Sequence, residues 1–338
     1  MIKEAIAKLV ERNNLTQLEI TRVMKEIMDG KATPSQIAAF ITALRLKGET
    51  IDELTGAAKV MRERAETIKV SDNNLLVDTC GTGGDKTGTF NISTISAFVA
   101  AGAGVKIAKH GNRSVSSKCG SADLMEALGV NINLSPLKVG VCIEEIGIGF
   151  LFAPIFHKAM KHVSIPRSEI GIRTIFNILG PLTNPAQAKA QIIGVYDSSL
   201  TEVFAYVLKD LEVKEAMIVN GYPGMDEISI IGPTKVSHLK NGEISNYTIE
   251  PEEFGYSLRS MDSILGGDIS KNVEITLLVL DGKKGPEREV VEINAAAAIL
   301  VSGIAKDLKE GIKLAKDSID KGYAKKKLND LIKISKTL

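Results

Sequence analysis

Two stretches of the chain combine glycines, cations and hydroxyls in a way that suits binding an anion with several phosphate oxygens. In the first, a short apolar run leads into a glycine-rich loop, residues 81–85, and a helix is expected to begin near Asn91. The second, residues 109–117, supplies Lys109, Arg113 and several hydroxyls. Glycine lets the backbone approach anionic oxygens, and the N–H groups at a helix start point towards them. Together the two loops predict a site for a ligand that carries more than one phosphate.

The side chains expected at the start of this helix are unusually polar. Asn91, Ser93 and Thr94 occupy three of four consecutive positions. Simple N-capping would account for any one of them. Three polar side chains exceed what a cap needs, and this favours phosphate binding at the helix start.

Two adjacent acids, Asp226 and Glu227, follow a glycine- and proline-containing turn, residues 221–224. Mg²⁺ typically binds through one or two carboxylates together with phosphate oxygens, so this pair is a candidate metal site. Solvated acids on a surface turn are an equally good interpretation of the sequence, since such pairs are common on protein surfaces.

A few further polar side chains are candidates for individual roles. His157 and His162 are five residues apart and do not share a helix face, which argues against a zinc pair. Arg167 is suited to a substrate carboxylate or, alternatively, to a surface ion pair. For His110 a neutral packing or hydrogen-bonding role is favoured over that of a general base. Nothing near Cys119 marks it as an activated nucleophile, so a packing role is favoured.

The bulk composition is that of an ordinary globular protein. The chain has 338 residues, of which 44% are hydrophobic and 25% charged, and a net charge of +1 gives no general reason to expect nucleic-acid or membrane binding. The three cysteines, Cys80, Cys119 and Cys142, are odd in number and show no metal-ligand spacing. Together with the absence of an apolar stretch at the start of the sequence, they predict a cytoplasmic location.

The residues up to about 68 are expected to form four helices. Three of these share a start signature in which a threonine is followed three residues later by Glu or Gln, at Thr16, Thr33 and Thr50. No catalytic cluster occurs in this region, so a packing or dimerising helical module is predicted.

From residue 75 onwards, short apolar runs alternate with helical patterns, which predicts a mostly parallel sheet covered by helices. Ligands bind beyond the carboxyl ends of the strands in such sheets, where both polar loops fall. Residues 227–256 show strand-like alternation around a turn at Asn241-Gly242. The strand candidates are Leu75–Val77, Val105–Ala108, Gln191–Tyr196, Ala216–Val219 and Ile275–Leu280.

The expected fold is therefore α/β: a small α-helical domain and a larger α/β domain with a mostly parallel central sheet flanked by helices. Residues 1–68 and roughly 135–185 are assigned to the helical domain. Residues 69–134 and roughly 186–338 are assigned to the α/β domain, with a helical tail from Val291.

Several long motifs resemble the anthranilate phosphoribosyltransferase family, and the resemblance covers nearly the whole chain. They are Asp78–Asp85, Phe90–Thr94, Lys109–Arg113, Gly120–Asp123, His157–Met160, Gly171–Asn177 and Leu179–Pro185. The resemblance implies transfer of a phosphoribosyl group from phosphoribosyl pyrophosphate to the amine of anthranilate, in tryptophan biosynthesis. It also implies Mg²⁺, a homodimer formed through the helical domain, and an active site between the two domains.

The resemblance further implies a role for each matching residue. Ser93, Asp226 and Glu227 would hold Mg²⁺. Anthranilate would meet Asn112 and Arg167, with Gly81, His110, His157 and Pro181 along its path. The implied contacts to phosphoribosyl pyrophosphate are Gly81, Gly84, Asp85, Thr89, Asn91, Ile92, Ser93, Thr94, Lys109, His110, Gly111, Asn112, Arg113, Ser114, Val115, Ser116, Ser117 and Ser121.

The chemistry of this reaction agrees with the residues available. The nucleophile is a neutral aromatic amine, so no activated protein nucleophile is required, and neutralising the departing pyrophosphate is the main task. We therefore expect no essential general acid or base. Two alternatives are a pyrimidine nucleoside phosphorylase, which Arg167 and the acidic pair argue against, and a non-catalytic nucleic-acid-binding relative. A nucleic-acid-binding relative should have a basic groove and should lack the Asp226-Glu227 pair, and the sequence shows neither feature.

Overall fold

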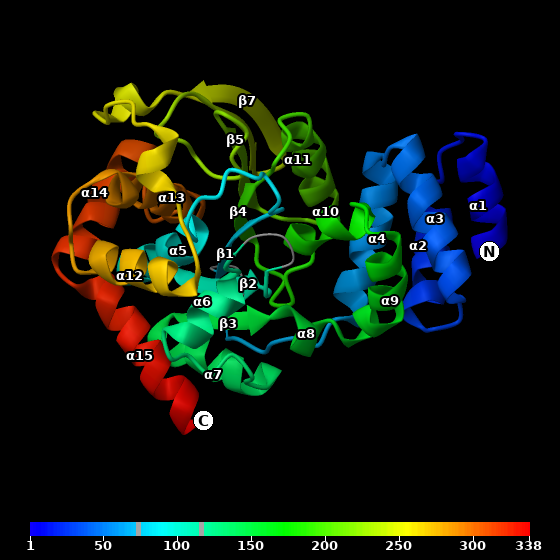
Figure 1. Ribbon diagram of the computed structural model, residues 1–338, viewed down its shortest axis with the longest axis horizontal. Helices are drawn as coiled ribbons and strands as arrows, with labels where there is room; N and C mark the ends of the chain where they lie inside the picture. Colours follow the sequence, from blue (N-terminus) through cyan, green and yellow to red (C-terminus); the bar gives the residue numbers. More distant parts are fainter. Residues whose placement is uncertain (72–75, 115–117) are drawn as a thin grey trace.

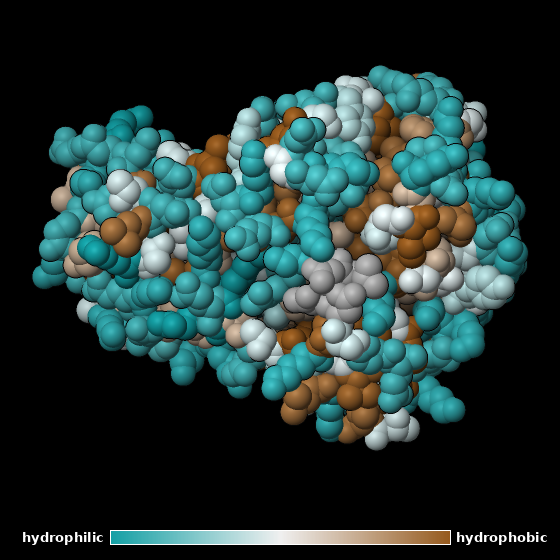
Figure 2. Space-filling view, turned by 180° about the vertical axis from the view of Figure 1, so that it is seen from behind, coloured by the Kyte–Doolittle hydropathy of each residue, from teal (hydrophilic) through white to brown (hydrophobic). Residues whose placement is uncertain are grey.

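The structure, a computed structural model, describes residues 1–71, 76–114 and 118–338. A bundle of helices lies beside a larger α/β part (Figure 1). Seen from behind, the outline shows two lobes with a notch between them. The smaller lobe is mainly hydrophilic on this face, whereas the larger one also shows several hydrophobic patches (Figure 2). Among the described residues, no helix is long and apolar enough to cross a membrane.

The bundle begins with the four helices predicted from the sequence. They are α1 (Ile2–Val10), α2 (Gln17–Met28), α3 (Pro34–Lys47) and α4 (Ile51–Arg64). Thr16, Thr33 and Thr50 each form the predicted capping box, in which the threonine accepts from the third helical N–H and that residue's side chain accepts in return. From later in the sequence, α9 (Lys161–Ile170) packs on α2 and α3, and α10 (Ile175–Leu182) packs on α3 and α4.

The α/β part is built on one seven-stranded sheet in the order β3-β2-β1-β4-β5-β6-β7. Its first five strands are parallel, and β6 and β7 are antiparallel, which confirms the mostly parallel sheet. The predicted turn at Asn241-Gly242 joins β6 to β7. The strands are β1 (Leu76–Gly81), β2 (Lys106–Gly111), β3 (Ile148–Phe152), β4 (Ala190–Gly194), β5 (Glu215–Gly221), β6 (Thr234–Lys240) and β7 (Glu243–Ile249).

Helices pack against the sheet, as expected for this class. The first helices of this part are α5 (Ile92–Gly102), α6 (Ser121–Ala127), α7 (Pro136–Ile146) and the short α8 (Ala153–Phe156). Those that follow are α11 (Leu200–Asp210), α12 (Ile269–Leu280), α13 (Pro286–Val301), α14 (Leu308–Asp320) and α15 (Tyr323–Thr337). Within the described ranges, short 3₁₀ helices span Lys158–Met160, Pro251–Phe254 and Met261–Ile264. Helix α5 contacts β1, β2 and α13, whereas α11 contacts β5, β6 and α4.

The two parts share an apolar core. One cluster of buried side chains runs from Phe40 and Leu54 in the bundle to Phe204 in α11 and Ile218 in β5. The bundle is therefore anchored to the sheet through α4 and α11.

One expectation about the strands was wrong. The run Ile275–Leu280, predicted as a strand, is the end of α12. Asp268 caps this helix by accepting from Lys271 N at 2.9 Å, and Ile275 and Val279 are buried four residues apart. A short continuous apolar run does not reveal its period, so the sequence alone could not separate helix from strand here. The N-terminal expected strand contains Val77 in β1, but its first residue, Leu75, lies outside the described residues.

The first part of the segment from about 135 to 185, which the sequence assigns to the helical domain, packs on the sheet. Helix α7 packs against β3, and β3 pairs in parallel with β2. Residues 136–152 therefore belong to the α/β part, and the chain enters the bundle only after β3. The five residues of β3 are all buried and follow Gly147, whose φ of +80° ends α7, so a short edge strand was read as part of a helical stretch.

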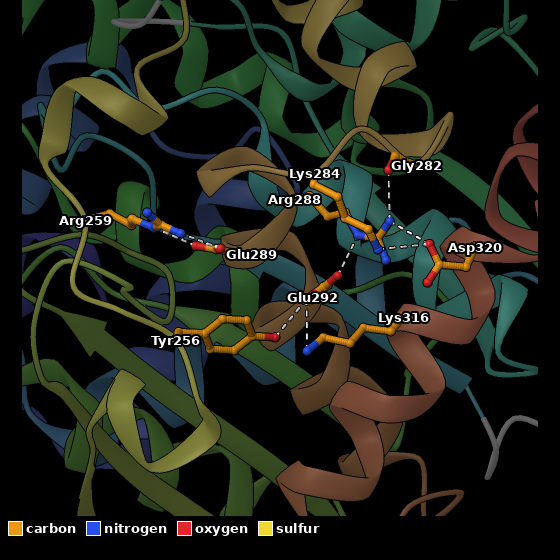
Figure 3. Close-up of polar contacts among 9 residues, drawn as sticks. All are labelled: Tyr256, Arg259, Gly282, Lys284, Arg288, Glu289, Glu292, Lys316 and Asp320. Atoms are coloured by element: carbon orange, nitrogen blue, oxygen red, sulfur yellow. Dashed lines mark hydrogen bonds and ion pairs between the residues drawn. The ribbon is translucent and has the colours of Figure 1, made fainter.

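A buried polar network stabilises the helices behind the sheet (Figure 3). Arg288 in α13 is 1% exposed and donates to Glu292 Oε1 at 2.6 Å, to Asp320 Oδ1 at 2.7 Å and to Gly282 O at 3.0 Å. The Tyr256 hydroxyl donates to the other Glu292 oxygen at 2.9 Å. Because α13 packs on α5, this network supports the helix whose start faces the two polar loops.

Candidate active site

The predicted site lies where the carboxyl ends of neighbouring parallel strands face the helical bundle. Gly81 ends β1 and is in register with Gly194, which ends β4, and β2 ends at Gly111. The glycine-rich loop, the second polar loop and the acidic turn all start from this edge of the sheet, as the topology of parallel sheets predicts.

The glycines let the acidic turn lie directly over the strand ends. A Cβ at Gly81 would lie 2.3 Å from Asp226 Oδ2, and one at Gly194 would lie 1.5 Å from the Asp226 carbonyl oxygen. Gly83, at φ +64°, donates its N–H to Asp226 Oδ2 at 2.7 Å. Side chains at Gly81 and Gly194 would push the acidic turn away from the strand ends.

The acidic pair faces inward, towards the two loops, so it is not a pair of solvated surface acids. Glu227 Oε1 accepts from the N–H of Ser93 at 3.0 Å, at the start of α5. Burial and the nearby charge of Asp85 raise the pKa of Asp226 to about 7. The pKa of Glu227 is also raised, by burial and by Asp226. The charge of Asp85 thus disfavours ionisation of Asp226, and the charge of Asp226 disfavours ionisation of Glu227.

No set of three or more His, Cys, Asp or Glu side chains is close enough to hold a metal ion by itself in the part of the chain that the structure describes. An ion here would need further oxygen ligands, such as a hydroxyl or the phosphate oxygens of a substrate. A cation at this position would stabilise the charged forms of Asp226 and Glu227, which burial and the neighbouring carboxylates disfavour.

The side chains at the start of α5 are not used as caps. Asn91 is the N-cap residue but makes no side-chain cap hydrogen bond. Its Nδ2 instead donates to Cys119 O at 3.1 Å. Asn91 Oδ1 and Thr94 Oγ1 are buried and have no hydrogen-bond partner among the described residues. The capping interpretation therefore does not account for these residues, whereas a bound polar ligand would.

Lys109 lies beneath the start of α5 and not in solvent. Only 1% of it is exposed, and its ammonium donates to Thr79 O at 2.5 Å and approaches Ser93 Oγ at 3.4 Å. Burial lowers the pKa of Lys109, and the charge of Asp78 opposes that shift. The side chain therefore brings a cation to the space between β1, β2 and the helix start.

Asn112 and Arg113, from the second loop, contact α6. Asn112 O accepts from Ala122 N at 3.1 Å and from Ser121 Oγ at 3.3 Å. Arg113 is directed towards α6, with ion pairs to Asp123 at 3.0 Å and Glu126 at 2.9 Å. Val115, Ser116 and Ser117 lie outside the described residues.

Two histidines lie side by side on the face of the site nearest the bundle. The ring centroids of His110, at the end of β2, and His157, after α8, are 5.2 Å apart. Burial lowers the pKa of His110 to about 3 and that of His157 to about 4, so both rings are neutral near pH 7. Each ring has a backbone hydrogen bond, at Gly180 and Thr183 respectively, and a buried Nε2 with no partner among the described residues.

Arg167 projects from α9 with its guanidinium 5.5 Å from the centroid of the Phe176 ring. Burial lowers its pKa, and no carboxylate pairs with it within the described ranges. The alternative of a surface ion pair is therefore not what the structure shows. Pro181 is buried in α10, and its carbonyl accepts from Gln191 at 3.1 Å.

Sequence reasoning missed the residues that support this site from behind. Asp78, fully buried in β1, accepts from the N–H of His110 at 3.1 Å. Thr79 accepts from Lys109, and its hydroxyl donates to Ser93 O at 3.1 Å. Both are polar residues inside a buried strand, and that is the signal that could have identified them. Burial raises the pKa of Cys119 to about 11, which agrees with the packing role expected from the sequence.

Comparisons with known proteins agree with this geometry. Residues 3–65 match the glycosyl transferase family, helical bundle domain, and residues 73–325 match the glycosyl transferase family, a/b domain. The anthranilate phosphoribosyltransferase of Acetivibrio thermocellus is 54% identical over 335 residues, which cover 99% of this chain and 97% of that protein. That of Alkaliphilus metalliredigens is 54% identical over 338 residues, covering 100% and 99% respectively.

Solved structures give the same result. The anthranilate phosphoribosyltransferase from Thermus thermophilus superposes with a TM-score of 0.93 at 39% identity, covering 98% of this chain and 99% of that one. The Saccharomyces cerevisiae enzyme in complex with PRPP and Mg gives a TM-score of 0.92 at 29% identity, covering 100% and 98%. The chain therefore belongs to the anthranilate phosphoribosyltransferase family, and the resemblance seen in its sequence is confirmed.

Proposed function

We propose that the protein transfers the phosphoribosyl group of phosphoribosyl pyrophosphate to the amine of anthranilate, giving N-(5-phosphoribosyl)anthranilate and pyrophosphate in tryptophan biosynthesis. The observation that carries the proposal is the convergence of Asp226 and Glu227 on the glycine-rich loop and the start of α5, with Arg167 on the facing helix. The related yeast enzyme has been solved in complex with PRPP and Mg, and also with 4-fluoroanthranilate.

The phosphate-bearing substrate is assigned to the sheet side of the site. The unpartnered oxygens of Asn91 and Thr94 and the buried ammonium of Lys109 all lie at the start of α5. N–H groups and a helix dipole there favour an anion. The other contacts to this substrate are those predicted from the sequence for the two loops and for Ser121. Arg113 would leave its ion pairs with the carboxylates of α6 and bind a phosphate group instead.

Mg²⁺ fits the acidic turn. The pKa values of Asp226 and Glu227 are raised because burial and a neighbouring carboxylate, Asp85 for Asp226 and Asp226 for Glu227, disfavour their charged forms. A divalent cation would stabilise those charged forms. Together with Ser93 they would hold the ion. When bound, Mg²⁺ neutralises negative charge that develops on the departing pyrophosphate.

Anthranilate is assigned to the bundle side. Arg167 has no carboxylate partner of its own among the described residues and would pair with that of the substrate, close to Asn112. The neutral rings of His110 and His157, with Gly81 and Pro181, would border the aromatic ring. Because the attacking amine is neutral, these residues have to orient it and exclude water, and no general acid or base is needed.

We further propose a homodimer formed through the helical domain. Three large apolar side chains on neighbouring helices of the bundle are exposed: Val10 by 64%, Leu18 by 59% and Leu46 by 74%. Burying such a group against a second copy would be favourable. The helical domain then comprises residues 1–68 with the segment from α8 to about 185, and the remainder forms the α/β domain. A cytoplasmic location agrees with thiols that form no disulfide.

Loss of anthranilate fluorescence tests the activity. The signal should fall only when the protein, phosphoribosyl pyrophosphate and Mg²⁺ are all present, and each omission serves as a control. A loss that persists without phosphoribosyl pyrophosphate, or no loss with all components, would contradict the proposal. Phosphorolysis of a pyrimidine nucleoside by the same preparation would favour the nucleoside phosphorylase alternative.

A further inference from the structure

Arg173 lies at a point of contact between the two parts of the molecule. It belongs to the short connection between α9, which carries Arg167, and α10, which carries Pro181. Its Nη2 donates to Gly83 O at 3.3 Å, in the glycine-rich loop. Its guanidinium carbon lies 4.2 Å from the centroid of the Tyr196 ring, just beyond the end of β4. The side chain therefore spans from the bundle to the loop.

The loop is shaped to receive this side chain. A Cβ at Gly84 would lie only 1.2 Å from Arg173 Nη2, so the guanidinium occupies the space that any other residue at position 84 would fill. Gly84 has a φ of +71°. Tyr196 itself contacts the loop, because the backbone N–H of Tyr196 donates to Thr82 Oγ1 at 3.1 Å. A planar cation that stacks and donates at once is a property of Arg and not of Lys.

Gly83 is consequently held from both sides. Its N–H donates to Asp226 Oδ2 at 2.7 Å, and its carbonyl accepts from Arg173. A glycine-rich loop is flexible in isolation, and fixing it before the ligand arrives reduces the ordering cost of binding. We propose that Arg173 is a positioning residue that clamps the Gly83–Gly84 turn onto the acidic turn, and thereby presets the phosphate-binding loop from the anthranilate-binding side.

This inference rests on the proposed function for its kinetic consequence but not for its structural one. Arg173→Met should raise the KM for phosphoribosyl pyrophosphate about tenfold, a typical loss for one hydrogen bond with a cation–π contact. The KM for anthranilate at saturating phosphoribosyl pyrophosphate should change less than about twofold, within the small effects expected away from the binding contacts. The KM of Arg173→Lys for phosphoribosyl pyrophosphate should lie between those of the wild type and Arg173→Met, because lysine keeps the charge but does not stack on the Tyr196 ring in the same way. Arg64→Met, which removes an exposed ion pair with Asp29, is the matched control.

A double-mutant cycle tests the contact itself. Gly84→Ala should impair the protein strongly while Arg173 is present, because the methyl group and the guanidinium compete for the same space. In the Arg173→Ala background, Gly84→Ala should reduce activity by a smaller factor. The relative activity of the double variant should therefore exceed the product of the relative activities of the two single variants. Strictly multiplicative effects would overturn the proposal.

Hydrogen exchange of the ligand-free protein provides the readout that does not depend on catalysis. Amides of residues 81–88 should exchange faster in Arg173→Met than in the wild type, with the bundle helices unchanged and Arg64→Met showing neither effect. Unchanged exchange in that loop would overturn the clamp even if the enzyme is active. Faster exchange in a protein without transferase activity would support the clamp and contradict the proposed function, so the two failures are distinguishable.

Discussion

Gly81 lies directly beneath the carboxylate of Asp226, so close that a methyl group on Gly81 would come within 2.3 Å of Oδ2. The two residues are far apart in the sequence. They meet because the turn after β5 reaches across Gly194, at the end of the neighbouring strand β4, to Gly81 at the end of β1. The absence of a side chain at one strand end thus makes room for an acid that follows another strand. This close approach places the acidic turn over the glycine-rich loop.

The acidic pair should be essential for turnover. Asp226→Asn combined with Glu227→Gln should reduce kcat severely while the fold remains intact, because both inferred metal ligands lose their charge. Steady-state rates across an Mg²⁺ titration and a circular dichroism spectrum would check this. The exposed adjacent acids Glu252 and Glu253, changed to Gln, form a matched control. Near-normal rates of the Asp226/Glu227 variant at limiting Mg²⁺ would remove the metal assignment.

The raised pKa of Asp226, about 7, predicts a pH dependence of metal binding. A carboxyl group must lose its proton to bind a cation, so Mg²⁺-dependent binding of phosphoribosyl pyrophosphate should strengthen as the pH rises from about 6 to about 8. For the metal-free protein the sign is opposite: ionising a carboxyl whose folded pKa is raised costs stability as the pH rises from its unfolded value towards about 7. Titration calorimetry at several pH values should show a steeper trend for the wild type than for Asp226→Asn. Identical trends would contradict the assignment.

Arg167 should act on anthranilate. Arg167→Ala should raise the KM for anthranilate about ten- to a hundred-fold, since a charge-assisted pair is worth roughly 1.5–3 kcal/mol. The KM for phosphoribosyl pyrophosphate should change much less. Lys161→Ala, an exposed cation at the start of the same helix, controls for general charge. Equal increases in both Michaelis constants would indicate a structural role for Arg167 instead.

Lys109 should act on the phosphoribosyl side. Lys109→Ala removes a buried ammonium that lies 3.4 Å from Ser93 Oγ, and we expect a raised KM for phosphoribosyl pyrophosphate and a lower kcat. Direct binding of anthranilate should change little. Lys106→Ala is a control from the same strand, because Lys106 pairs with Glu144 at 3.0 Å on the surface. An unchanged kinetic profile for both substrates in Lys109→Ala would exclude a phosphate role.

The network behind the sheet predicts an effect on stability alone. Tyr256→Phe removes the buried hydrogen bond to Glu292 and should lower the free energy of unfolding by about 1–3 kcal/mol, because it leaves a charged acceptor less satisfied. Urea denaturation would measure this, with Tyr206→Phe on the exposed face of α11 as the control. KM values should be unaffected in both variants. Equal stability of the two variants would contradict the role given to the network.

Local signals in the sequence were sufficient for much of the fold. The capping boxes at Thr16, Thr33 and Thr50 depend on neighbours three residues apart, and they formed as predicted. The end of α12 and the edge strand β3 were missed because a short buried apolar run looks the same in a helix and in a strand. Their identity depends on packing partners far away in the sequence.

The site likewise contains some features that the sequence predicts and others that depend on tertiary contacts. The glycine-rich loop and the polar start of α5 were visible as a continuous motif, whereas the clamp of Arg173 on Gly83 joins residues 90 positions apart. The burial of Lys109 was also not apparent, since a lysine at the end of a strand is usually solvated. Contacts of this kind follow from tertiary structure and have no local signature.

The most direct test of the central claim is the stoichiometry of the reaction. With the wild-type protein, Mg²⁺, anthranilate and phosphoribosyl pyrophosphate, one pyrophosphate should appear for each anthranilate consumed, and the Asp226→Asn/Glu227→Gln variant should produce neither change. Pyrophosphate release that proceeds equally without anthranilate, or anthranilate loss without pyrophosphate, would contradict the account.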